Sequence, residues 1–222
     1  MPEMPTASDV FDVIDGDDAD LLDALLAESP GLAASRDDEG VSAVLHSLYH
    51  GRPSLAAKLA AALPRLDVFE AAALGRADRV RELLAAEPDL ARAQSPDGFT
   101  ALHLPAFFGG EGTADATRAL IEAGADLNAR SDNSFWVLPL HSAAAGGHAE
   151  IVEILLAAGA APDERQRHGW TALHAAAQNG DLRSLEALLA AGADPTLRND
   201  DGLSAADLAT AGGHEELVAR LG

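Results

Sequence analysis

The chain has 222 residues, a formal net charge of −21, 48% hydrophobic residues and 23% charged residues. This length suits one or two domains of ~150 residues or one elongated array, and the apolar content excludes disorder throughout. The absence of cysteine excludes disulfides, thiolate metal ligands and a cysteine nucleophile. The acidic excess disfavours binding of nucleic acid or of an anionic membrane surface. With 49 Ala and 33 Leu against nine aromatic residues, the composition predicts an all-α fold.

The N-terminal segment predicts a short tail followed by helical structure. Residues 1–40 hold 12 acidic residues and one base, Arg36. The first residues carry neither a basic segment nor an apolar one, so we expect no signal peptide. Nothing approaches 18 consecutive apolar residues, so we expect no membrane span and a cytoplasmic protein. We expect a flexible tail over residues 1–8 and one folded domain over residues 9–222.

The first half of the chain contains a duplicated segment. Asp9–Phe11 recurs 58 residues later as Asp67–Phe69, and residues 9–51 and 67–109 agree at 14 of 43 positions. This self-similarity predicts two copies of a pair of degenerate helical units.

The two copies are joined unusually closely. Pro53–Leu63 can form a helix, and only Pro64–Asp67 separates it from the next one. The interval between these two units is 24 residues, too short for a full unit, so we expect that the usual turn between units is missing here.

The second half repeats a four-residue motif more regularly. Thr-Ala-Leu-His occurs at Thr100–His103 and Thr171–His174, Leu-Pro-Leu-His at Leu138–His141, and Ser-Ala-Ala-Asp at Ser204–Asp207. The fourth residues of these motifs are spaced by 38, 33 and 33 residues, and a glycine follows each one six residues later. The period of 33 and the Thr-x-Leu-His signature resemble the ankyrin repeat.

The resemblance implies an all-α ankyrin-repeat solenoid of about seven helix-turn-helix units, with degenerate N-terminal units. Each unit would present a turn tip and one exposed helix face, because stacked units bury their apolar faces against their neighbours. The family typically binds other proteins, so we expect a non-catalytic interaction module that is a monomer, uses no cofactor and binds neither nucleic acid nor membrane. One Lys against 14 Arg, together with the abundant Ala, is typical of a GC-rich bacterial genome.

The recurring histidines are predicted to be structural. Stacked units lie ~8–10 Å apart, whereas the ligands of one zinc each lie ~2 Å from it, so His103, His141 and His174 cannot share a metal. In the family this histidine bonds to the threonine three residues earlier. Thr100 and Thr171 are in place for that, but position 138 is Leu.

One further histidine pair has the spacing of metal ligands. His46 and His50 lie at i and i+4 on a predicted helix, but a catalytic zinc needs a third ligand, and position 47 is Ser where a His-Glu-x-x-His motif has Glu. The acidic run 15–20 lacks the spacing of a calcium loop and is better explained as a helix N-terminus. We therefore predict no metal site and no catalytic residues.

The aromatic residues mark the predicted partner surface, because seven of the nine fall at turn tips or on exposed helix faces. Aromatic and arginine side chains dominate interface energies. The predicted partner-binding residues are Tyr49, His50, Phe99, Phe107, Phe108, Phe135, Trp136, Arg165, His168 and Trp170.

Two irregularities leave alternatives open. Pro105 stands inside a predicted helix and should kink it or delay its start. Three extra residues lie within 109–116 and two within 133–136. Phe107, Phe135 and Trp136 could plug the resulting gaps instead of binding a partner. An enzyme or small-molecule binder would need a closed pocket at Pro105 and Trp136, and an inhibitor driven by charge would use the acidic N-terminal face.

Overall fold

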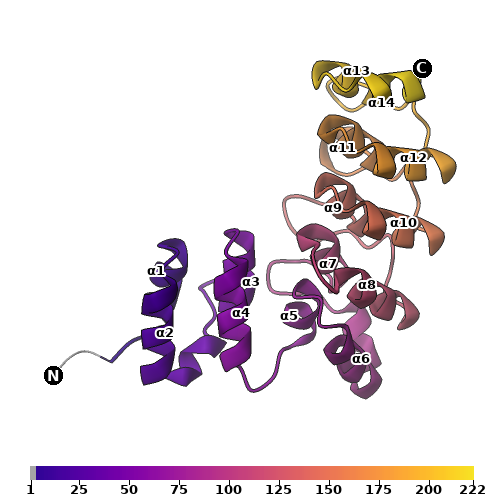
Figure 1. The fold of residues 1–222 in the computed structure, drawn as a ribbon. Helices are drawn as coiled ribbons and strands as arrows, with labels where there is room; N and C mark the ends of the chain where they lie inside the picture. The colour runs from indigo at the N-terminus through magenta and orange to yellow at the C-terminus, as the bar shows by residue number, and fades with distance from the viewer. Residues whose placement is uncertain (1–3) are drawn as a thin grey trace.

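The computed structural model describes residues 4–222 and shows a curved stack of helix pairs (Figure 1). Within these residues there are fourteen α-helices and no β-strand. Seven antiparallel pairs follow one another along the chain, as the sequence predicts. The pairs are α1 (Ala7–Asp15) with α2 (Ala19–Glu28), α3 (Ala43–Tyr49) with α4 (Pro53–Ala62), α5 (Val68–Ala73) with α6 (Ala77–Ala86), α7 (His103–Phe108) with α8 (Thr113–Glu122), α9 (Pro139–Ala145) with α10 (Ala149–Ala157), α11 (Ala172–Asn179) with α12 (Leu182–Ala190), and α13 (Ala205–Ala211) with α14 (Glu215–Leu221).

Small apolar side chains hold neighbouring pairs together. The first helices α5, α9, α11 and α13 are rich in Ala, which lets the backbones of successive pairs approach closely. Leu155, Leu185 and Leu188 fill the space between pairs and have no exposed surface. The core is therefore shared between neighbours, and the fold is a helical solenoid.

Tight turns project from the stack between most pairs, and we call them fingers. Backbone hydrogen bonds close them, for example Ser95 N to Phe99 O at 2.8 Å and Asn199 N to Leu203 O at 2.9 Å. In the finger that follows α8, Ser131 N donates to Val137 O at 2.8 Å, so this finger carries two more residues than the others. This confirms the predicted insertion near residues 133–136.

The predicted missing finger is also confirmed. Only residues 63–67 join α4 to α5, and most buried apolar residues belong either to one cluster in α1–α4 or to another in α5–α14. A third, small cluster spans the junction and consists of Val41, Leu45, Ala73 and Leu104. The array changes direction at the same junction (Figure 1). An exposed ion pair between Arg36 and Asp67, 3.1 Å apart, spans it.

The duplication predicted from the sequence is visible in the structure. A 3₁₀-helix at Pro30–Ala34 follows α2, and its counterpart at Pro88–Arg92 follows α6, exactly one 58-residue shift later. The helices α2 and α6 are related by the same shift.

The first helix begins earlier than expected. Helix α1 starts at Ala7, two residues before the predicted start of the domain at Asp9. The backbone N–H of Thr6 donates to Asp9 Oδ2 at 2.6 Å, and this capping interaction extends the helix into the predicted tail. The tail prediction over residues 1–8 therefore fails for Ala7 and Ser8, and residues 1–3 lie outside the described residues.

Pro105 delays the start of its helix, as predicted. Helix α7 begins at His103, whereas the equivalent helix α11 begins at Ala172, two residues before its own motif histidine. The ring of Pro105 then lies in the first turn, where the missing backbone donor costs nothing.

The turn after α7 is lengthened and packs against the preceding pair. Gly75 approaches this turn so closely that a Cβ added to it would lie 2.2 Å from the carbonyl oxygen of Glu111. Gly75 and Gly112 also have positive φ, so both positions require glycine. Within residues 4–222 no helix has the length and apolar character needed to cross a bilayer.

The divided core predicts graded stability along the array. Amide hydrogens of α1–α4 should exchange faster than those of α9–α12, because only one small apolar cluster links the first two pairs to the rest. Hydrogen exchange followed by mass spectrometry would measure this order. Slowest exchange in residues 9–66 would contradict it.

Candidate functional site

Two of the motif histidines make the hydrogen bonds that the resemblance implies. His103 Nδ1 lies 2.8 Å from Thr100 Oγ1, and His103 Nε2 donates to the carbonyl oxygen of Val137 at 3.1 Å. His174 repeats this arrangement with Thr171 at 2.8 Å and with the carbonyl oxygen of Leu203 at 3.1 Å. Each histidine therefore ties its own helix pair to the next finger.

His141 is the exception that the sequence predicts. Its Nε2 donates to the carbonyl oxygen of Trp170 at 3.2 Å, but its buried Nδ1 has no partner because Leu138 stands where the motifs of His103 and His174 have Thr. Burial lowers the pKa of both His103 and His141 to about 4, against the ordinary 6.5, so both rings are neutral at pH 7.

Four of the predicted partner-binding residues form one group, which we call the aromatic cluster: Tyr49, Phe99, Phe107 and Phe108. The ring centroid of Tyr49 lies 5.1 Å from that of Phe108, 6.1 Å from that of Phe107 and 6.4 Å from that of Phe99. Tyr49 reaches from α3 past the short α5 to residues of α7 and its preceding finger. The cluster therefore bridges the junction where the finger is missing.

Polar contacts fix the aromatic cluster in place. The hydroxyl of Tyr49 donates to Asp97 Oδ2 at 2.6 Å, and burial together with this carboxylate raises the pKa of Tyr49 well above its usual range. Tyr49, Phe99 and Phe108 are half-buried, whereas Phe107 is 48% exposed. Phe107 is thus the member that offers most of its surface to a partner.

The lengthened finger carries the two most exposed aromatic side chains of the array. Phe135 is 64% exposed and Trp136 is 53% exposed, so neither plugs a gap in the core. The guanidinium of Arg130 lies 4.6 Å from the centroid of the Trp136 ring, a cation–π contact that orients the indole. Trp136 adopts φ 55°, a conformation that the extended finger imposes.

A shallow hollow of about 380 Å³ lies between this finger and the next one. Phe135 and Trp170 lie on its two sides, and Arg167 spans it by donating to the carbonyl oxygen of Ser134 at 2.7 Å. No Asp or Glu is among its lining residues, which are Ser134, Phe135, Val137, Gln166, Arg167, His168 and Trp170.

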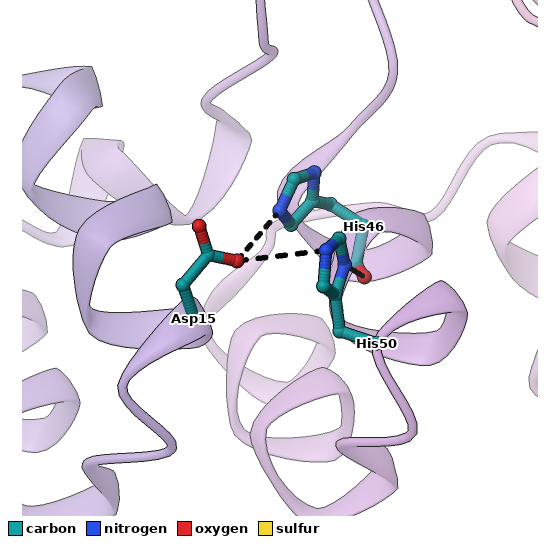
Figure 2. Close-up of side chains that lie close together, drawn as sticks. All are labelled: Asp15, His46 and His50. Atoms are coloured by element: carbon teal, nitrogen blue, oxygen red, sulfur yellow. Dashed lines mark hydrogen bonds and ion pairs between the residues drawn. The ribbon is translucent and has the colours of Figure 1, made fainter.

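The structure separates His50 from the other predicted contact residues. Its ring stacks on that of His46, with centroids 4.2 Å apart, and both imidazoles face Asp15 (Figure 2). The sequence analysis found no third ligand for this pair, whereas the structure places Asp15 Oδ1 3.3 Å from His46 Nε2. Among the described residues this is the one group of three side chains with converging metal-ligand atoms.

Comparison with known proteins supports the identity of the regular units. Residues 97–132 match the family described as ankyrin repeat, and residues 131–199 match the family described as ankyrin repeats in three copies. Residues 97–199 are ankyrin repeats. The matched region covers α7–α12, and the helix pairs on either side of it stack onto it with the same paired arrangement.

A short segment of the chain is also similar to a curated protein, the 2-5A-dependent ribonuclease of Mus musculus. The two are 41% identical over 61 residues, which are 28% of this chain and 8% of the mouse protein. A match confined to so small a part of the mouse protein concerns the repeat and transfers no activity.

In the part of the chain that the structure describes, Pro105 and Trp136 do not line a common pocket. Pro105 is buried in α7 between Leu104 and Ala106, so it offers no wall to an open cavity. Trp136 lies on a fingertip and stacks on Arg130. Arg130 was missed in the sequence analysis, because nothing in its neighbourhood marks it as the partner of an indole six residues later.

The neutral buried histidines predict a loss of stability in mild acid. The pKa of His103 and of His141 is lower in the folded chain than in the unfolded chain, so the unfolded state binds more protons between about pH 4 and 6.5. The free energy of unfolding should therefore fall as the pH drops from 6.5 towards 4, by up to about 3 kcal/mol for each histidine.

Urea unfolding at pH 7, 6 and 5 would measure this dependence. This range lies above the ordinary pKa of carboxylates, so the histidine contribution dominates it. The exposed His168, changed to Asn, serves as the control and should leave the dependence unchanged. Equal stability at pH 7 and pH 5 would contradict the prediction.

The hydroxyl of Thr171 should contribute measurably to stability. The change Thr171→Val keeps the shape but removes the hydroxyl that lies 2.8 Å from His174 Nδ1, which then keeps only the backbone N–H of residue 171 at 3.2 Å, and it removes the side-chain part of a helix cap. We expect a cost of about 1–3 kcal/mol in the free energy of unfolding. The exposed Thr210, changed to Val, should cost less than ~0.5 kcal/mol in the same assay. Similar losses in the two variants would show that the Thr–His pair adds nothing.

Proposed function

We propose that this protein is a non-catalytic interaction module that binds a partner protein through its fingertips and the exposed helix face beside them. The observation that carries the proposal is the exposure of Phe107, Phe135 and Trp136, each close to half or more exposed. Exposed large aromatic side chains disfavour solubility, so their concentration at neighbouring units indicates a binding surface.

The surface has the size and composition of a protein interface. The three residues belong to one helix and to the finger that follows its pair, and successive units are ~10 Å apart. A partner that also reached Trp170 would cover roughly 20–30 Å, which suits a standard interface. Asp97, Asp132 and Asp200, with Arg165 and Arg167, supply a mixed polar rim around the aromatic side chains.

The aromatic cluster gives this surface a rigid base. Tyr49 packs against Phe99 and Phe108 and donates a hydrogen bond to the Asp97 carboxylate. Phe107 packs against Phe108 and is therefore presented on a preorganised support. Binding to a preorganised surface loses less conformational entropy than binding to a mobile one. A protein with net charge −21 also favours a partner with basic groups over nucleic acid. We propose that the unbound protein is a monomer.

A triple variant tests the surface. Phe107→Ser, Phe135→Ser and Trp136→Ser together should weaken partner binding by more than ~100-fold, because aromatic anchors typically contribute ~2 kcal/mol or more each. The melting temperature should change little, since these side chains are already exposed. The partner is first captured from a host lysate and then purified for titration.

The matched control is Leu21→Ser, which removes a side chain that is 47% exposed on α2. A true partner binds this control normally and loses affinity for the triple variant. Equal binding to both would place the interface elsewhere. If added salt abolishes partner binding but the triple substitution does not weaken it, the interface lies on the acidic N-terminal units instead.

A further inference from the structure

Asp15, His46 and His50 form a compact group between the first two helix pairs (Figure 2). Asp15 is the last residue of α1, and the two histidines lie on the last turn and at the C-cap of α3. Asp15 Oδ1 lies 3.3 Å from His46 Nε2 and 3.6 Å from His50 Nε2. One ligand atom from each of the three side chains lies within 4.8 Å of the other two.

Each imidazole also has a hydrogen-bond contact at its Nδ1 atom, on the side of the ring that faces away from Asp15. His50 Nδ1 donates to the carbonyl oxygen of His46 at 2.9 Å. His46 Nδ1 faces Asp37 Oδ2 at 3.4 Å. The carbonyl oxygen of His46 only accepts, so His50 Nδ1 carries the proton and the neutral His50 ring presents its Nε2 lone pair. His46 lies between two carboxylates that both accept, Asp37 at Nδ1 and Asp15 at Nε2, and its Nε2 binds a cation when the proton is on Nδ1.

This arrangement brings three potential metal-ligand atoms within 4.8 Å of one another. With the proton of His46 on Nδ1, two imidazole lone pairs and a carboxylate oxygen face the same space and repel one another, and a positive charge between them removes this repulsion. Protonating both rings would instead place two cations in stacked rings with centroids 4.2 Å apart. A single divalent cation satisfies all three donors at once.

The spacing of the donors suits a small transition-metal ion. In a tetrahedral zinc site with bonds of ~2.0–2.1 Å, neighbouring ligand atoms are ~3.3–3.5 Å apart. The two distances from Asp15 Oδ1, 3.3 and 3.6 Å, lie at this value. Two imidazoles and one carboxylate are a donor set that prefers zinc over calcium or magnesium.

We infer that Asp15, His46 and His50 bind a zinc ion that joins the first helix pair to the second. Two histidines at i and i+4 on one helix face are a frequent pair of zinc ligands. The fourth position is open to water or to a side chain of a partner. The site lies on different units from the exposed aromatic residues, so the inference does not depend on the proposed function.

The surroundings hold the ligands as zinc sites usually do. Asp37 lies 3.4 Å from His46 Nδ1, as in the carboxylate–histidine–metal arrangement that orients a ligand ring. The ring of Phe11 packs edge-on against His46, with centroids 4.9 Å apart. The acidic excess of residues 1–40 also favours a cation here.

Zinc titration of the full-length chain, carrying no histidine tag, tests the inference. Isothermal calorimetry should give one zinc per chain, and zinc should raise the melting temperature, because the ion binds the folded state. Asp37→Asn should lower the affinity for zinc by ~10–100-fold. His50→Ala and Asp15→Asn should each lower this affinity more, because each removes a ligand. Both altered side chains are about half exposed or more, so these variants should fold.

Two matched controls separate this site from weak attraction to acidic or histidine side chains. Asp12→Asn changes an exposed carboxylate on the same helix, and His168→Asn removes an exposed histidine on a distant finger. Both should bind zinc as the unaltered chain does. Binding that survives His50→Ala and Asp15→Asn, or that falls equally in the controls, would overturn the inference.

Nitrogen NMR of the imidazoles supplies a direct readout. Without zinc, Nδ1 of His50 should carry the proton, and zinc should shift the Nε2 resonances of His46 and His50 alone. No heat of binding and no change in these resonances at millimolar zinc would show that the group is an ordinary histidine–aspartate contact.

Discussion

The apolar interface between neighbouring helix pairs is the interaction on which the rest of this structure depends. No pair can bury its own apolar face, so the stability of each unit comes from the unit beside it. The Ala-rich helices α5, α9, α11 and α13 make this possible, because small side chains let successive pairs pack closely. The second half of the array satisfies this requirement regularly, and its fingers stack through backbone bonds such as that from Asp132 N to Gly98 O, 2.7 Å long.

The junction between α4 and α5 is where this regularity breaks. Without a finger, the two large core clusters separate, and only a small apolar cluster of Val41, Leu45, Ala73 and Leu104 spans the junction. The aromatic cluster is the main replacement: Tyr49 reaches across the gap and hydrogen-bonds to Asp97 in the next finger. The same irregularity therefore weakens the array and builds the rigid support for Phe107. In the regular units, by contrast, histidines such as His174 join each pair to the following finger through buried hydrogen bonds.

The two binding surfaces proposed here occupy different parts of the array for a common reason. The side chains of a fingertip or a helix end are not part of the apolar core, so they can be aromatic, charged or metal-binding without loss of packing. Phe135 and Trp136 use the extra length of one finger, and Asp15 uses the end of α1. Arg130 orients Trp136 through a cation–π contact, and Phe11 packs against His46 beside Asp15.

The sequence by itself determined the features that are local or periodic. The helix pairs, the glycine turns, the missing finger, the late start of α7 and the orphaned nitrogen of His141 all follow from spacing and from single residues, because each depends on neighbours within one unit or one period. The tertiary structure alone decided which residues meet across units whose register is irregular. Asp15 lies 31 residues from His46, and Tyr49 lies 48 residues from Asp97. A repeat period predicts such contacts only where the units stack regularly. Across the degenerate N-terminal pairs and the missing finger, packing sets the relative positions, so the third metal ligand and the aromatic cluster emerge only in the folded chain.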